Sequence, residues 1–167
     1  MTLRQAPPAR YLRFFGDFSR FQNPDALHSG NMTSTALPYE FAIDVAQDDI
    51  DFMGHVNNAS YLKWVQEAVI SHWQALAPVE AVAEHLWVAL KHEITYRKPA
   101  FLEDDVVATV LLEKVQGARA FYETVIRRGS EVLAEVKSSW CCLDAETLRP
   151  ARLAREVIDK FFVKAED

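Results

Sequence analysis

Side chains that can do acid–base chemistry gather in one stretch of eleven residues in this 167-residue chain. The stretch begins with Asp51 and contains His55, the neighbours Asn57 and Asn58, and finally Tyr61. A carboxylate can act as a nucleophile, or as the base that activates a water molecule. Asp, Gly and Asn are typical of loops, so the carboxylate is expected on a loop. This stretch is therefore the first candidate for a reaction centre.

An amphipathic helix is predicted directly after that loop, over residues 59–76, where apolar side chains recur at spacings of three and four. Asn57 or Asn58 is well suited to cap its first turn. A helix N-terminus presents unpaired backbone N–H groups and the positive end of the helix dipole. Such groups stabilise a carbonyl oxygen that gains negative charge. A carboxylate beside these N–H groups supplies what hydrolysis of an acyl thioester needs.

The elements around this helix are predicted to be mainly strands. One long helix followed by antiparallel strands indicates an α+β fold, in which a curved sheet wraps around the helix. The open edges of such a sheet favour a homodimer with the sheets joined edge to edge. The predicted strands cover residues 39–45, 87–96, 106–115, 120–128 and 132–143, with short helices over 80–85 and 155–163.

Composition indicates one ordinary globular domain and excludes several classes of protein. The net charge of −6 disfavours a nucleic-acid partner, which prefers basic surfaces. The apolar runs are far shorter than the roughly 18 residues that a membrane span needs. The two cysteines, Cys141 and Cys142, are neighbours and would face opposite sides of a strand. With no disulfide framework, a cytoplasmic location is expected.

The first 36 residues differ from the rest in charge and pattern. Their four arginines and two aspartates give +2, which leaves −8 for the remainder. They show no clean periodicity, so residues 1–36 are predicted to be an irregular or loosely packed extension, and residues 37–167 the folded domain. A targeting segment, or sequence upstream of a true start at Met32, are the alternatives.

The string from Asp51 to Tyr61 resembles the signature of the 4-hydroxybenzoyl-CoA thioesterase family. It is most similar to the bacterial long-chain acyl-CoA thioesterases, in which an Asp and three further residues precede His-Val-Asn-Asn-x-x-Tyr-Leu. Residues 94–99 and 102–106 also resemble the family's strand, proline and acidic turn. The resemblance covers about residues 38–153 and implies a hotdog fold, a curved antiparallel sheet around one long central helix.

The resemblance also implies roles for individual residues. Asp51 matches the catalytic carboxylate, and the backbone N–H of Asn58 matches the group that polarises the thioester carbonyl. His55 matches a residue that positions or assists the carboxylate, while Asn57 and Tyr61 are expected to contact the substrate. Plant acyl-ACP thioesterases are similar here but carry an Asn two residues after the Asp, where this chain has Met53. The departure favours coenzyme A over a carrier protein.

We expect the chain to hydrolyse an acyl-CoA to a free acid and coenzyme A, without a metal or a bound cofactor. Arg97 and Lys98, at a strand end before Pro99, are the first choice for the coenzyme A phosphates. Trp64 or Trp73 are candidates to line the acyl pocket. That pocket is expected at the interface of a homodimer or homotetramer, with residues from the second copy contributing.

Several alternatives stay open on the sequence alone. Asp51 could be a turn residue, and Glu67 is a rival because a second hotdog lineage carries its catalytic acid on the long helix; its neighbours indicate a solvated face. No Gly-x-Ser-x-Gly or His-Glu-x-x-His motif is present, which favours carboxylate chemistry. An acyl-ACP thioesterase and a non-catalytic acyl-CoA-binding protein are the competing functions.

Overall fold

The computed structural model describes residues 35–163, so almost all of the predicted extension, residues 1–36, lies outside the described part. Two of its residues, Thr35 and Ala36, form the short strand β1 (Thr35–Ala36). This strand pairs antiparallel with β7 (Phe162–Val163), so the two ends of the described chain meet in a two-stranded sheet.

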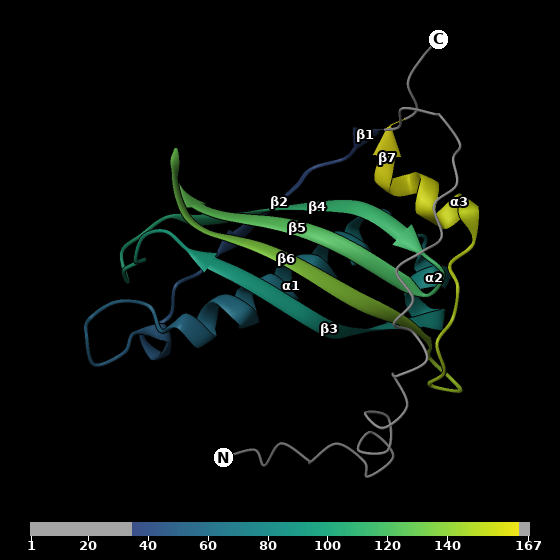
Figure 1. Ribbon diagram of the computed structural model, residues 1–167, viewed down its shortest axis with the longest axis horizontal. Coiled ribbons are helices and arrows are strands. Elements are labelled where there is room, and N and C mark those ends of the chain that lie inside the picture. The colour runs from purple at the N-terminus through teal and green to yellow at the C-terminus, as the bar shows by residue number, and fades with distance from the viewer. Residues whose placement is uncertain (1–34, 164–167) are drawn as a thin grey trace. The chain divides into compact units, whose positions relative to one another are not determined.

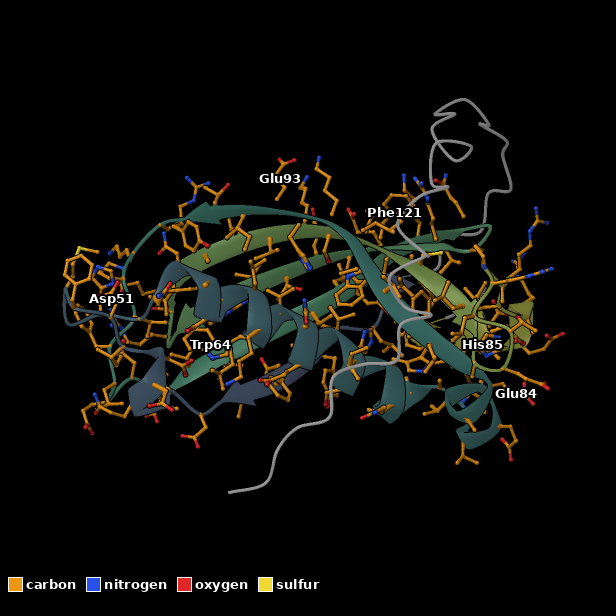
Figure 2. All side chains as sticks on the ribbon, turned by 90° about the horizontal axis from the view of Figure 1, so that it is seen from below. Asp51, Trp64, Glu84, His85, Glu93 and Phe121 are labelled. Carbon is orange, nitrogen blue, oxygen red and sulfur yellow. The ribbon has the colours of Figure 1, made fainter. Side chains whose placement is uncertain are left out.

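The main sheet has five strands in the order β2-β4-β5-β6-β3, and every neighbouring pair is antiparallel. The sheet arches over one long helix, which lies across its inner face (Figures 1 and 2). The predicted α+β class is therefore confirmed. The strands are β2 (Tyr39–Ile43), β3 (His85–Tyr96), β4 (Val106–Gln116), β5 (Arg119–Arg128) and β6 (Glu131–Asp144).

The long helix, α1 (Asn58–Leu76), buries one wide apolar face against the sheet. Its buried residues follow spacings of three and one, repeated, which place this face on a single side of a 3.6-residue helix. Leu62 also fits the predicted spacing of three and four, but it is 36% exposed, because the buried face of the helix is centred beside it. The helix ends before Pro78, which has no N–H to continue it. The buried residues are Tyr61, Trp64, Val65, Ala68, Val69, His72 and Trp73.

The predicted terminal helix over residues 155–163 is wrong in its length. The chain forms α3 (Arg155–Ile158), one 3₁₀ turn, η5 (Asp159–Phe161), and then β7. Phe161 is 1% exposed and stacks on Trp73, with ring centroids 5.8 Å apart. Burial of this ring and pairing of β7 with β1 replace the helix that the apolar spacing indicated.

The two short remaining helices are η4 (Gln47–Asp49), which precedes the loop of Asp51, and α2 (Val79–Glu84). Strands β2 and β3 are the edges of the main sheet, and within the described residues β3 pairs only with β6 along its 12 residues. No helix in the described part is long and apolar enough to cross a bilayer.

Candidate active site

The loop before α1 is a tight turn closed by backbone hydrogen bonds. Ile50 and Val56 form a β-bridge, and the N–H of Asp51 donates to the carbonyl of His55 at 2.9 Å. The N–H of Gly54 donates to the carbonyl of Asp51 at 3.0 Å, and Gly54 has a φ of 80°. Glycine adopts this left-handed conformation without steric cost. The turn therefore fixes the backbone that carries Asp51.

The carboxylate of Asp51 lies beside the first turn of α1, at the opposite end of the helix from His85 and Glu84 (Figure 2). Its Oδ1 accepts a 2.8 Å hydrogen bond from the N–H of Met53. Its Oδ2 is 3.9 Å from Nδ1 of His55, and the side chain is 15% exposed. One oxygen is therefore held by the turn, while the other has no hydrogen-bond donor in the described part of the chain.

His55 lies next to Asp51 without a hydrogen bond to it, since 3.9 Å is too long. Its Nδ1 is 3.1 Å from the carbonyl oxygen of Val56. A carbonyl oxygen accepts and never donates, so Nδ1 carries the proton in neutral His55 and Nε2 is free to accept one. The ring can therefore orient a water molecule or take up a proton near the carboxylate.

The start of α1 leaves one N–H group open. Asn57 is the N-cap, and its Oδ1 accepts from the N–H of Ala59 at 2.9 Å. The N–H of Asn57 donates to the carbonyl of Asp49 at 2.7 Å, and that of Ser60 to the carbonyl of Asn57 at 2.9 Å. The N–H of Asn58 has no acceptor among the described residues.

Electrostatics at this helix start favour a negatively charged ligand atom. The first turn contains no acidic residue, so no carboxylate of the helix itself neutralises the positive end of the helix dipole. Asn58 is an exposed residue, and its N–H has no acceptor among the described residues. A carbonyl oxygen that becomes negatively charged would be stabilised there.

Contacts of Ala100 and Asp49 hold the loop in place, and sequence patterns reveal neither of them. The N–H of Val56 donates to the carbonyl of Ala100 at 2.8 Å, in the loop after β3. Asp49, which is 4% exposed, accepts from the N–H of Ala46 through Oδ2 at 3.0 Å. Because the carbonyl of Asp49 also accepts from Asn57, this residue connects η4 to the helix start.

Tyr61 lies in the core at 2% exposure, instead of at the surface where a substrate contact is expected. Burial raises the pKa of its phenol, and a backbone hydrogen bond from Ala100 opposes that shift. Its ring lies edge-on to that of Tyr96, with centroids 5.2 Å apart. Tyr96 was not predicted as a site residue, although the alternation of the predicted strand places it on the helix-facing side with Ile94.

Arg97 and Lys98, predicted to bind phosphates, are both paired with carboxylates on β6. Arg97 contacts Glu135 at 2.7 Å, and Lys98 contacts Glu131. Both cationic side chains are 56% exposed. Arg128 joins the network by contacting Glu131 and Asp104. A phosphate would compete with these carboxylates for the two cations.

The remaining candidates lie away from Asp51 or in the core. Glu67 is exposed on α1 with no ion-pair partner in the described part of the chain. Trp64 is 1% exposed and packs against Tyr61. Trp73 borders a small gap between side chains near the last turns of α1, and no residue of the Asp51 loop lines this gap.

Exposed apolar side chains lie on the turn of Asp51 and on the loop that is bonded to this turn. Phe52 is 96% exposed and Met53 is 60% exposed at the tip of the turn. Phe101 and Leu102, in the loop bonded to Val56, are 44% and 36% exposed. We call these four residues the apolar rim. A rim of this kind suits an apolar acyl group or another protein surface.

Among the described residues, no three His, Cys, Asp or Glu side chains gather as metal ligands would. The expectation that the reaction needs no metal or bound cofactor stays a prediction.

Comparisons with known proteins agree on one family. The family model of the thioesterase-like superfamily matches residues 45–161. The chain is 30% identical over 118 residues to the long-chain acyl-CoA thioesterase FadM of Escherichia coli strain K12. That match covers 66% of this chain and 87% of the relative.

Solved structures agree with this match. A thioesterase of Thermus thermophilus, in complex with coenzyme A and Zn, is 25% identical with a TM-score of 0.63, over 73% of this chain and 90% of that one. A probable thioesterase of Bartonella henselae is 27% identical with a TM-score of 0.61, over 71% of this chain and 99% of that one. The predicted hotdog fold is thereby confirmed.

Proposed function

The chain belongs to the thioesterase-like superfamily, and from that premise we propose that this thioester hydrolase cleaves an acyl-CoA to a free carboxylic acid and coenzyme A. The observation that carries the proposal is the open N–H of Asn58 at the start of α1, together with the carboxylate of Asp51, which lies at the same end of that helix (Figure 2). A long-chain acyl-CoA thioesterase as a relative at 30% identity supports the acyl-CoA substrate.

In the proposed reaction, the thioester carbonyl oxygen accepts a hydrogen bond from the N–H of Asn58. Asp51 then acts in one of two ways, either attacking the carbonyl carbon or removing a proton from an attacking water. In the first route, the carboxylate oxygen bonds to carbon, the carbon–sulfur bond breaks and the thiolate of coenzyme A leaves. Water then hydrolyses the resulting anhydride, which restores Asp51 and supplies the proton for the thiolate. In the second route, the water oxygen bonds to carbon, the carbon–sulfur bond breaks, and the proton passes to the leaving sulfur. The negative charge that develops on the carbonyl oxygen is stabilised by the positive end of α1.

His55 assists in this proposal without binding Asp51 directly. Its free Nε2 can accept a hydrogen bond from the water that Asp51 activates. Asn57 acts through its cap, which shapes the helix start where the substrate binds. Tyr61 lies on the first turn of α1 with its side chain buried in the core, so it supports the site from the protein interior.

Arg97 and Lys98 are proposed to contact the coenzyme A phosphates. Both side chains are more than half exposed, so they can rotate toward a ligand. Exposed ion pairs contribute about 0–1 kcal/mol, so loss of Glu135 or Glu131 as partners costs little. A doubly charged phosphate is the stronger competitor for Arg97.

We further propose that the acyl pocket forms between two copies of the chain. The apolar rim at Asp51 is open, and the small gap beside Trp73 contains no residue of the Asp51 loop. The long edge strand β3 can continue the sheet into a second copy. A homodimer is the smallest such assembly, and a homotetramer also satisfies these observations. The cytoplasmic location stays a prediction.

Asp51→Asn provides the decisive test. The amide oxygen of the substituted side chain can still accept the N–H of Met53, so the turn keeps its hydrogen bond while the carboxylate is lost. We expect wild-type turnover on a panel of acyl-CoAs of different chain length, and a loss of kcat of about 1000-fold or more in the variant. The matched control is Glu67→Gln, an exposed carboxylate on α1, with activity unchanged.

Other outcomes identify the alternatives. Turnover of acyl-ACP with none of acyl-CoA would indicate a carrier-protein thioesterase, while binding without any turnover would indicate a non-catalytic acyl-CoA-binding protein. An inactive Glu67→Gln together with an active Asp51→Asn would assign the reaction to the helix carboxylate.

A further inference from the structure

The hydroxyl of Tyr96 connects the edge strand β3 to the first turn of α1. It donates a 2.9 Å hydrogen bond to the carbonyl oxygen of Asn58, across 38 residues of sequence. The residue that accepts this bond is the one whose own N–H is open at the candidate site. The two groups belong to neighbouring peptide units that share the α-carbon of Asn58, so a restraint on one restrains the other.

The ring of Tyr96 packs against a buried ring in the core. It packs at 88° against the ring of Tyr61, which is 2% exposed. Tyr61 receives a backbone hydrogen bond from Ala100, and the carbonyl of Ala100 accepts the N–H of Val56 at 2.8 Å. The contacts thus run from the loop of Asp51 through Ala100, Tyr61 and Tyr96 to the helix start.

We propose that Tyr96 is a positioning residue for thioester hydrolysis, whose hydroxyl holds the first turn of α1 so that the N–H of Asn58 points at the reacting carbonyl oxygen. The inference rests on the proposed function and adds a residue to it. Displacement of a catalytic group by a fraction of an ångström costs rate, because the hydrogen bond must be aligned in the transition state.

Tyr96 is better suited to positioning than to stabilising the fold. It is 41% exposed at the end of its strand, so its hydroxyl does not fill an internal site. Burial of part of the ring raises the pKa of the phenol, so the hydroxyl keeps its proton at neutral pH and remains a donor. Replacement of the hydroxyl by hydrogen keeps the ring contact with Tyr61 and removes one hydrogen bond.

The test compares Tyr96→Phe with Tyr39→Phe in the full chain. Tyr39 provides a matched control, because its hydroxyl also bonds α1, at Ser71 Oγ with 2.7 Å, far from the helix start. We expect Tyr96→Phe to lower kcat about tenfold with KM unchanged, and Tyr39→Phe to leave both constants unchanged. Thermal unfolding of both variants reports whether either change acts through stability.

Two non-hydrolysable analogues isolate the positioning role. One is an acyl-CoA ketone, with a methylene between the carbonyl and the sulfur, and the other is the matching thioether without a carbonyl. Wild type should bind the ketone more tightly, and Tyr96→Phe should lose about threefold to tenfold of that preference while binding the thioether equally well. A general structural defect or a direct substrate contact would weaken both analogues together, which would overturn the proposal.

The outcome also separates this inference from the proposed function. Wild-type turnover that Asp51→Asn abolishes and Tyr96→Phe leaves intact would overturn the role of Tyr96 and keep the proposed reaction. Absence of thioester turnover in wild type would overturn both.

Discussion

The imidazole of His72 lies on the buried face of α1 among the rings of Tyr39, Tyr122 and Phe161. It is fully buried, and neither of its ring nitrogens has a hydrogen-bond partner in the described part of the chain. Burial penalises the charged form, so the pKa of His72 falls from 6.5 to about 4. His72 is therefore neutral in the folded protein at pH 7.

This burial predicts acid sensitivity with a defined sign. In the unfolded chain, His72 takes up a proton below pH 6.5, whereas in the folded chain it does so only near pH 4. The free energy of unfolding therefore decreases as the pH falls through this window, by up to about 3 kcal/mol for this group. His72→Phe should lose much of that decrease, as urea unfolding at pH 7 and pH 4.5 would measure.

At pH 7 the same variant should be as stable as wild type or more stable, because phenylalanine removes an unpartnered polar group of similar shape. Equal pH slopes for the two proteins would contradict the assignment to His72. His92→Phe is a useful comparison, since burial lowers the pKa of His92 as well, in a ring that is less enclosed.

Sequence patterns predicted the helix after the Asp51 loop and its cap, because both depend on neighbours within a few residues. The catalytic role of Asp51 stays a prediction. The cap is Asn57, one of the two asparagines proposed for it. Local sequence patterns did not predict the long-range contacts. Glu135 is 38 residues from Arg97, and no local pattern indicates that the two side chains pair. The tyrosine hydroxyl at Asn58 was missed for the same reason.

Helix α1 begins on a neutral cap with no acidic residue in its first turn. Helices generally favour acidic side chains there, where they interact with the dipole. At this helix, the absence of such residues keeps the positive end available for a ligand. The cap side chain bonds the N–H of Ala59, so the cap also determines which N–H groups stay open.

Substitutions at Asn57 should separate the effect of the cap on stability from the effect of a negative charge on catalysis. Asn57→Ala removes the cap and should cost about 1 kcal/mol of stability, whereas Asn57→Ser should keep most of it. Asn57→Asp should preserve the cap, yet lower kcat, because a fixed negative charge opposes the developing oxyanion. Chemical denaturation and steady-state kinetics measure the two effects, and an Asn57→Asp variant with full kcat would argue against an oxyanion at this helix.

The element pattern of the chain was largely predictable, because each strand alternates and each turn carries glycine or acidic residues. The predicted helix over 59–76 starts one residue late, and the predicted strands agree within a few residues. The C-terminal segment was mispredicted, since burial of Phe161 against Trp73 is a tertiary contact that overrides helical spacing. The domain start at residue 37 stays a prediction, and β1, just before it, pairs with β7.

At the scale of the whole molecule, the apolar rim and the edge of β3 both predict a second copy. If the acyl pocket lies between copies, dilution should reduce the specific activity and the molecular mass of the assembly over the same concentration range. We expect the specific activity per chain to fall in the concentration range where sedimentation shows the dimer dissociating into single chains. Constant specific activity across that range would place the complete pocket within one chain.

The pairing of β1 with β7 brings the two ends of the described chain together (Figure 1), next to Phe161, which stacks on Trp73 near the C-terminal end of α1. Asp51 lies at the other end of that helix (Figure 2). A short peptide joining residue 163 to residue 35 would therefore close the chain without crossing the substrate site. New termini opened at the turn after Arg128, at Gly129, would leave β5 and β6 intact. Such a circular permutant should retain hydrolysis, since Asp51, His55 and the start of α1 keep their neighbours.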